Sequence, residues 1–200
     1  MTNWPEPEPM MGTDVTVSPL TLDHRVDLEE AAADGELNRL WYTSIPKPEG
    51  IIAEIERRLQ LQAAGSMLPF AIISNSSKKA VRMTTYMNID ADSRRLEIGS
   101  TWLRKSVQRS SYNTECKLLL LRHAFEKLSC IAVEFRTHFI NHQSRRAIER
   151  LGAKFDGIMR SHMVMGNGTV RDTAVYSIIS SEWPTVKINL MWQLEKPRDR

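Results

Sequence analysis

The chain has few cysteines, few aromatic residues and no long apolar run. Cys116 and Cys130 are its two cysteines. Each lies in an apolar stretch, which favours two core thiols in a reducing compartment over a disulfide framework. No window approaches the roughly eighteen consecutive apolar residues that a membrane-spanning helix needs. The first residues have neither a basic start nor an apolar stretch, so we expect no signal peptide and a cytoplasmic protein.

A strong charge of either sign is also missing. The 200 residues include 27 basic and 24 acidic ones, for a net charge of +3. This excess is too small to predict a nucleic-acid partner. The basic residues do gather locally, within 104–109 and 145–150, which suits a small phosphorylated ligand as well as a solvated surface. The length predicts one domain, and 42% hydrophobic with 26% charged residues is typical of a globular protein.

Hydrophobic periodicity and turn residues predict alternating strands and helices. Apolar residues at helical spacing mark a helix over 51–64, and leucines on many sides mark a buried helix over 113–128. Polar residues 75–79 and Gly166-Asn167-Gly168 predict hairpin turns. The remaining predicted elements are a helix over 24–33, a helix over 141–151, and strands over 15–20, 68–74, 80–89, 94–103, 130–136, 155–165 and 170–180.

This order predicts a single α/β (α+β) domain. We expect a mixed, mostly antiparallel central sheet of about seven strands with helices on both faces. Residues 1–13 are expected to be a flexible arm, 14–182 the domain, and 183–200 a C-terminal tail that docks on it. In strand 94–103, alternation predicts one face with Leu96, Ile98, Ser100 and Trp102, and another with Arg95, Glu97, Gly99, Thr101 and Leu103.

A polar loop before the leucine-rich helix carries the first functional signal. It combines basic and small hydroxyl residues at a helix N-terminus, where free backbone N–H groups and the helix dipole attract anions. A pyrophosphate would fit there. The alternative is a capped helix behind a polar loop, and the residues alone favour it slightly. We expect Asn113 to be the N-cap, with Glu115 in the first turn.

At this loop the sequence resembles the GNAT acetyltransferase superfamily, most closely its Rim-type ribosomal-protein N-terminal acetyltransferases. The family's Gln/Arg-x-x-Gly-x-Gly/Ala loop corresponds to Gln108-Arg109-Ser110-Ser111-Tyr112-Asn113. Asn141-His142-Gln143-Ser144 resembles its Asn-x-x-Ser helix. The order of elements also matches, over about Val15 to Ser180.

The resemblance implies an N-acetyltransferase with a GNAT-like acyl-CoA-binding domain, which uses acetyl-CoA and no metal. The cofactor is expected in the groove between strands 94–103 and 130–136, and a backbone N–H near Leu103 or Arg104 would hold the oxyanion. The implied cofactor-binding residues are Leu103, Arg104, Gln108, Arg109, Ser110, Ser111, Tyr112, Asn113, Thr114, Asn141 and Ser144.

Two positions depart from the family pattern. Ser111 replaces a usual glycine, and a positive φ there would cost on the order of 1 kcal/mol. Ile148 replaces the tyrosine that protonates the leaving thiolate in many relatives, so Ser144, water or Tyr176 would have to serve. As the catalytic base, the resemblance implies Glu97 and, less strongly, Glu134. The alternatives are a surface position for Glu97 and an ion pair with Arg136 for Glu134.

The acceptor is expected to be a protein N-terminal amine or a small-molecule amine. An α-amine has a pKa of about 7.7–8.0 against about 10.4 for lysine, so it is already partly neutral at cellular pH. A weak base is then sufficient, and an α-amine is mildly favoured as the acceptor. His138 and His142 straddle a strand end and a helix start, so no metal site is predicted. The chain is expected to be a monomer or homodimer without nucleic-acid or membrane partners. The alternative function is a non-catalytic acyl-CoA-binding or interaction module, which Ser111 and Ile148 favour.

Overall fold

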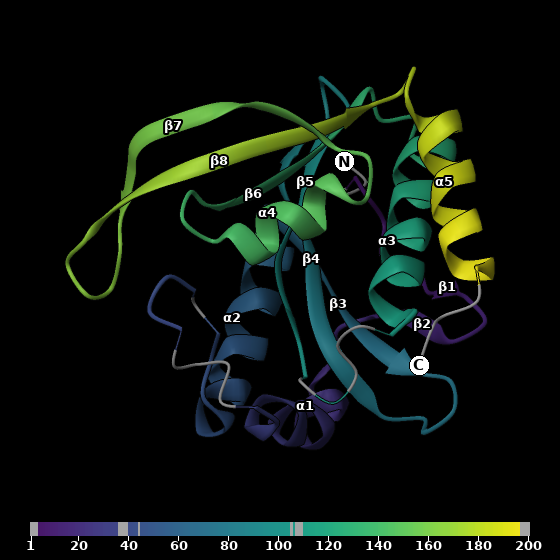
Figure 1. Ribbon diagram of the computed structural model, residues 1–200. Helices are drawn as coiled ribbons and strands as arrows, with labels where there is room; N and C mark the ends of the chain where they lie inside the picture. The colour runs from purple at the N-terminus through teal and green to yellow at the C-terminus, as the bar shows by residue number, and fades with distance from the viewer. Residues whose placement is uncertain (1–3, 36–39, 44, 105, 107–109, 197–200) are drawn as a thin grey trace.

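One open sheet runs through the molecule, and helices cover both of its faces (Figure 1). The computed structural model describes residues 4–35, 40–43, 45–104, 106 and 110–196. Within these ranges, the helices are α1 (Arg25–Ala33), α2 (Ile51–Ala63), α3 (Tyr112–Arg122), α4 (His142–Glu149) and α5 (Trp183–Glu195). The strands there are β1 (Met10–Met11), β2 (Val15–Pro19), β3 (Met67–Ser74), β4 (Ala80–Asp90), β5 (Arg95–Leu103), β6 (Ala132–His138), β7 (Lys154–Val164) and β8 (Val170–Ile179).

The sheet order of the described strands is β1-β2-β3-β4-β5-β6-β8-β7. Each neighbouring pair is antiparallel except β5 and β6. Those two strands are parallel because α3 carries the chain across the sheet between them. The predicted mixed, mostly antiparallel sheet is therefore confirmed. The eighth strand, beyond the expected seven, is β1. It lies in the segment that was expected to be a flexible arm, and it pairs with β2.

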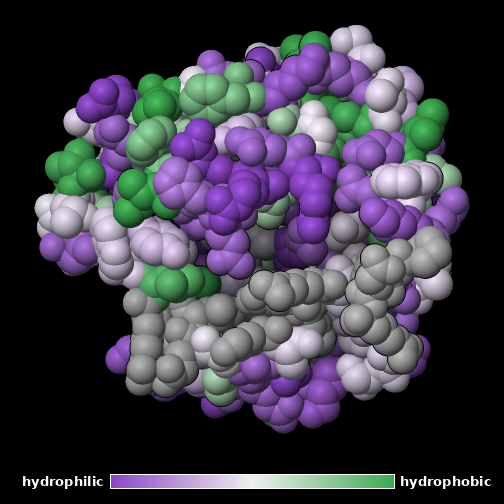
Figure 2. All heavy atoms as spheres, in the orientation of Figure 1, coloured by the Kyte–Doolittle hydropathy of each residue, from purple (hydrophilic) through white to green (hydrophobic). Residues whose placement is uncertain are grey.

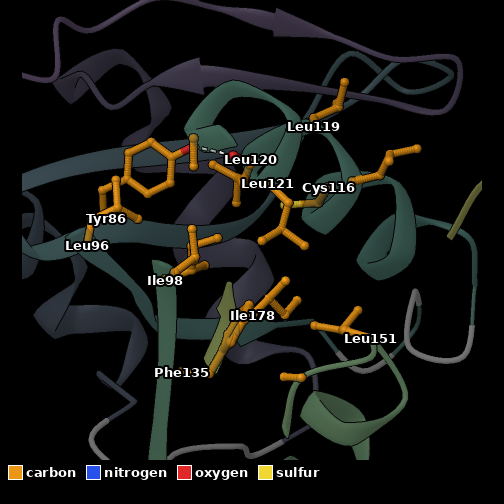
Figure 3. Packing of buried hydrophobic residues seen from close by; sticks show 14 of the residues in the cluster. Tyr86, Leu96, Ile98, Cys116, Leu119, Leu120, Leu121, Phe135, Leu151 and Ile178 are labelled. Carbon is orange, nitrogen blue, oxygen red and sulfur yellow. Dashed lines mark hydrogen bonds between the residues drawn. The ribbon is translucent and has the colours of Figure 1, made fainter. Parts of the chain in front are cut away.

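Two hydrophobic clusters hold the helices on the sheet. The larger one lies under α3 and α5 and includes Tyr86, Leu120 and Phe135. In it the Tyr86 hydroxyl donates a hydrogen bond of 2.6 Å to the Leu120 carbonyl (Figure 3). The smaller cluster lies under α1 and α2 on the opposite face. No helix in the described ranges is long and apolar enough to cross a bilayer.

Helix α5 explains why α3 is buried on so many sides. It lies beside α3 (Figure 1), and its Trp183, Val186 and Leu190 are buried in the larger cluster. These apolar residues are three and four positions apart, which is the spacing of one helix face. The sequence predicted only a docking tail here and no helix. Pro184 fits in the first turn of α5, where proline is well tolerated because that N–H has no intrahelical partner.

A β-bulge changes the facing of β5. Thr85 of β4 is opposite Gly99, whereas Met83 is opposite Trp102, so β5 contains one extra residue between these pairs. Ser100 has a φ of 50° at this point. The predicted alternation holds for Leu96 and Ile98 but is wrong from Ser100 onward. An extra residue reverses the facing of every side chain after it, so Trp102 packs in the cluster under α1 and α2.

Candidate functional site

Strands β5 and β6 separate halfway along their length. Their parallel pairing runs from Arg95↔Ala132 to Glu97↔Glu134, and no later pair occurs among the described residues. A cavity of about 260 Å³ lies where they separate. Its walls are Ile98–Thr101 of β5, Phe135–His138 of β6 and side chains of α3 and α4. The bulge at Ser100 bends β5 and so helps to open this space.

A second cavity of about 510 Å³ adjoins the first; we call the first the inner cavity and the second the outer cavity. The two share wall residues on β4, β5, α3 and α4, among them Arg82, Asn113 and Ser144. The outer cavity reaches Ser110 before α3 and Arg146 and Arg150 around α4. Hydrophilic side chains gather over the region of α4 at the centre of Figure 2. We call the two cavities together the β5–β6 groove; it lies where the sequence analysis expected the ligand.

The start of α3 differs from the expected arrangement. The helix begins at Tyr112 with Ser111 as N-cap, so the prediction of Asn113 as N-cap is wrong. Ser111 has a φ of −65° and ψ of −24°. This is ordinary helical backbone, so serine is not strained here and the glycine of the family pattern is not needed. The Ser111 hydroxyl donates to the Asp14 carboxylate and is thus engaged outside the groove.

Asn113 instead fixes a buried arginine. Its Oδ1 accepts a hydrogen bond of 2.6 Å from Nη1 of Arg82, which lies on β4 and is 1% exposed. The Nε of Arg82 is buried and has no hydrogen-bond partner among the described residues. Both side chains line the two cavities. A buried guanidinium with an unsatisfied N–H is well suited to bind an anion.

The structure brings only some of the predicted loop residues to the groove. Ser110 and Asn113 line it. The Tyr112 hydroxyl is instead 2.9 Å from the Ser74 hydroxyl, and Thr114 is buried. Gln108 and Arg109 lie outside the described residues.

Two further predicted residues, Leu103 and Arg104, lie at the end of β5 and differ in where their backbone N–H groups point. The Arg104 side chain turns away to pair with Asp34 at 2.9 Å, and its backbone N–H donates to the Val81 carbonyl at 3.4 Å. Leu103 ends β5 opposite Arg82. Because N–H groups alternate in direction along an antiparallel strand, the Leu103 N–H points away from β4. Of the two candidates for holding an oxyanion, Leu103 is therefore the better placed.

Helix α4 provides the other wall of the groove. Asn141 is its N-cap, as predicted, and its side chain accepts a hydrogen bond of 3.1 Å from the Ser144 N–H. Asn141 and Ser144 line both cavities, and Ile148 lines the inner one. The prediction that Asn141 caps this helix and borders the groove is confirmed.

Replacing Asn141 with alanine should lower the free energy of unfolding by about 1 kcal/mol, because the Ser144 N–H loses its cap. It should also weaken binding of the acetyl-CoA that the family resemblance implies, since the side chain borders the groove. Urea denaturation and calorimetric titration measure the two effects. Asn141→Asp is the control for the cap, because aspartate caps helices equally well. An Asn141→Ala protein of unchanged stability would contradict the capping role, and one with unchanged affinity would make Asn141 purely structural.

Glu97 is buried on the sheet face opposite α3. It is 5% exposed, so the alternative of a surface glutamate is wrong. It accepts a hydrogen bond of 2.7 Å from Asn88, and Arg136 lies 3.4 Å away. Burial raises the pKa of the Glu97 carboxyl, although Arg136 and Asn88 act in the other direction. A Cβ at Gly99 would lie 2.7 Å from Glu97 Oε1, so glycine provides the room for this carboxylate.

Two other candidates take structural positions. Glu134 accepts hydrogen bonds from Arg95 at 2.6 Å and Arg136 at 2.8 Å, as the ion-pair alternative predicted. Burial alone would raise the pKa of Glu134, but the hydrogen bonds and the positive charges of the two arginines outweigh it and lower the pKa. Tyr176 is fully buried, and its hydroxyl donates to Glu149 at 2.9 Å. Tyr176 is not among the described residues lining the groove, so the idea that it reaches in is wrong.

The structure adds Lys117 to the site, which the sequence analysis missed. It lies one helical turn beyond Asn113 on α3, lines the inner cavity and is 5% exposed. Burial and the charge of Arg82 lower the pKa of its ammonium to about 7. Its place in a run of leucines gave a hint, since the helix was predicted to be buried all round. Among the described residues, no group of three or more histidine, cysteine or acidic side chains is arranged to hold a metal ion.

Comparisons with known proteins agree with this architecture. A family profile described as an acetyltransferase (GNAT) domain matches residues 14–154. A GCN5-related N-acetyltransferase from Brucella melitensis is 30% identical, with a TM-score of 0.85 over 97% of this chain and 90% of that chain. A probable GNAT-family acetyltransferase from Chromobacterium violaceum is 25% identical, with a TM-score of 0.77 over 92% and 94% of the two chains.

A more distant structure shares the fold. RimJ from Mycobacterium smegmatis, in complex with CoA-disulfide, is 19% identical, with a TM-score of 0.76 over 96% of each chain. A comparison with curated protein sequences gives no match.

Proposed function

The chain belongs to the GNAT acetyltransferase family and is an acetyltransferase, and we propose that it moves the acetyl group of acetyl-CoA onto the α-amine of a protein N-terminus. The observation that carries this proposal is the β5–β6 groove. It runs from the first turn of α3 to the point where the two strands separate. A long ligand with an anionic end fits such a path.

The groove residues suit the parts of acetyl-CoA in order. Arg82, with its unsatisfied Nε, and the free N–H groups at the start of α3 would hold the phosphates. Asn141 and Ser144 would border the pantetheine arm. When bound, acetyl-CoA supplies an activated thioester carbonyl. The outward-pointing Leu103 N–H would then donate to the carbonyl oxygen, where negative charge develops.

The acceptor would approach from the face that carries Glu97. Glu97 would take the proton from the amine, directly or through water, and Gly99 provides the room that its carboxylate occupies. Trp41 and Tyr42 lie near this side, with their rings 5.6 and 6.4 Å from the His138 ring. A single carboxylate is a weak base for removing a proton from an amine. An α-amine, with a pKa of about 7.7–8.0, is partly neutral at pH 7 and suits it better than lysine.

Acetyl-CoA should raise the melting temperature of the protein. A ligand present at 100 times its dissociation constant stabilises the folded state by about 2.7 kcal/mol. We expect dephospho-CoA to give a smaller shift, and Arg82→Met to reduce the shift with either ligand. The matched control is Arg25→Met, which removes an exposed arginine paired with Glu29 on α1. No shift with millimolar acetyl-CoA would contradict the function.

The acceptor is tested separately with three sets of amines. These are peptides with free N-termini, the same peptides with blocked N-termini and one lysine, and small amines. Mass spectrometry should find acetylation on the free N-termini first. Faster acetylation of small amines would overturn the protein acceptor and leave acetyl transfer intact.

A further inference from the structure

Lys117 stands between the two separating strands. Its Nζ is 3.5 Å from the Thr101 hydroxyl on β5 and 5.6 Å from the centre of the Phe135 ring on β6. It lines the inner cavity but not the outer one. Arg82 and Asn113, nearer the start of α3, line both. The lysine therefore occupies the end of the groove farther from the proposed phosphate site.

The charge of Lys117 has no counter-ion among the residues that the structure describes. No carboxylate of the described residues lies within 4.0 Å of its Nζ, and the same holds for Arg82. A buried charge without a partner is costly and is kept only where something offsets it. Two such cations in one ligand groove indicate that the ligand brings negative charge to the groove.

The other groups around Lys117 favour a proton donor of moderate strength. Burial, followed by repulsion from Arg82, lowers its pKa to about 7, while Cys116 on α3 and Glu97 on β5 act in the opposite direction. Arg136, His138 and Arg171 line the same cavity. A thiol has a pKa of about 8.5, so an acid near 7 can give its proton to a thiolate favourably.

The other candidates for a proton donor are less well placed. Ile148 occupies the position where the family resemblance implies a tyrosine, and Tyr176 is bound to Glu149 and Arg145 instead. His138 lines the cavity, but its ring packs against Trp41 and Tyr42. Ser144 lines the groove, but a hydroxyl is a far weaker acid than an ammonium.

This inference rests on the proposed acetyl transfer. We propose that Lys117 is the general acid of the reaction and protonates the sulfur of CoA as it leaves. The lone pair of the amine nitrogen forms the new carbon–nitrogen bond, and the electrons of the broken carbon–sulfur bond stay on sulfur. A proton from the Lys117 ammonium moves to that sulfur and leaves a neutral amine. The proton released by the attacking nitrogen goes to Glu97 or water, and Lys117 is reprotonated from solvent.

Two substitutions separate charge from proton donation. Lys117→Met keeps most of the length of the side chain and removes both, whereas Lys117→Arg keeps the charge but holds its proton too tightly to donate it. With acetyl-CoA and a mixture of peptides with free N-termini, both should lower kcat roughly 100-fold with little change in the KM for acetyl-CoA. The wild-type kcat should fall at high pH as the ammonium is lost, and this fall should be absent in Lys117→Met. Lys154→Met, at an exposed lysine paired with Glu182, is the control.

Two measurements do not depend on turnover. Carbon-13 NMR of lysine-labelled protein should show one lysine that titrates near pH 7, and Lys117→Met should lack it. Calorimetry should show wild-type protein binding CoA about tenfold more tightly than desulfo-CoA, because the ammonium faces the sulfur. Lys117→Met should bind the two alike.

Several outcomes would overturn the proposal. Activity of Lys117→Met within twofold of wild type would do so, and so would a fully active Lys117→Arg, which would reduce the role to fixed charge. A wild-type preference for succinyl-CoA that vanishes in Lys117→Met would make the lysine a binder of an acyl carboxylate. These results concern Lys117 alone. Wild-type protein that binds neither CoA nor acetyl-CoA would overturn the proposed function as well.

Discussion

Replacing Glu115 with glutamine should lower the free energy of unfolding by roughly 3 kcal/mol, because each hydrogen bond to a buried charged group contributes about 1.5–3 kcal/mol. The Glu115 carboxylate, in the first turn of α3, accepts three backbone hydrogen bonds. They come from Thr13 at 2.7 Å and from Asp14 and Val15 at 2.8 Å. Glutamine keeps one acceptor oxygen and turns an NH₂ group toward the remaining donors.

The surroundings leave the glutamine little freedom to adjust. Glu115 is 6% exposed, and a Cβ at Gly12 would lie 2.7 Å from its carboxyl carbon. Urea denaturation measures the loss. The matched control is Glu29→Gln on α1, where the glutamate makes an exposed ion pair with Arg25. That control should cost less than about 1 kcal/mol. An equal cost for the two variants would contradict the role of Glu115 as a buried anchor.

This anchor also concerns the site. It ties the turn before β2 to the first turn of α3, two residues beyond Asn113 and two before Lys117. Both of those side chains point into the β5–β6 groove. Weakening the anchor should therefore lower the affinity for acetyl-CoA along with the stability.

Local patterns in the sequence were enough to predict most of the fold. Helical spacing located α2, and the leucine run located α3. The hairpin signals at 75–79 and 166–168 located the turns that join β3 to β4 and β7 to β8. Strands, turns and amphipathic helices depend on neighbouring residues, so a single sequence carries that information. The start of α3 was missed by two residues, which is usual for helix ends.

The features that make the site depend on distant contacts instead. The bulge at Ser100 arises from the pairing of β5 with β4, and nothing in the pattern around Gly99 required an extra residue. Arg82 lies in a strand and Lys117 in an apolar helix, and neither was assigned to the site from the sequence. Their meaning depends on the meeting of β4, β5 and α3 at one cavity. The resemblance to the family identified Glu97 as a candidate base, but nothing in the sequence predicted that its side chain is buried.

Replacing Glu97 with glutamine should lower kcat roughly 100-fold at pH 6–7, the scale of a lost general base. The proton to be removed is that of the amine, which is largely protonated below its pKa of about 7.7–8.0. The loss should therefore shrink above pH 8, where free amine no longer needs the carboxylate. Initial rates with acetyl-CoA and an N-terminal peptide, measured across this range, test the expectation.

Although Glu97→Gln should lower kcat, it should not lower the free energy of unfolding. Burial raises the pKa of Glu97, so the folded protein holds this proton more tightly than the unfolded chain. Its contribution to stability is then lost as pH rises through the folded-state pKa, and the ionised carboxylate is unfavourable at neutral pH. Glutamine removes that cost and can still accept from Asn88. Glu97→Gln should thus be at least as stable as wild type at pH 7.

Glu134→Gln is the matched control for Glu97→Gln. It lies on the same sheet face and breaks the pairs with Arg95 and Arg136, so it should lose stability and keep most of its activity. A carboxylate that serves catalysis lowers activity when removed and leaves stability intact, whereas a structural one does the reverse. An equal loss of rate at all pH values would assign Glu97 to positioning the acceptor. Full activity of Glu97→Gln would mean that water accepts the proton and that the α-amine is deprotonated before it binds.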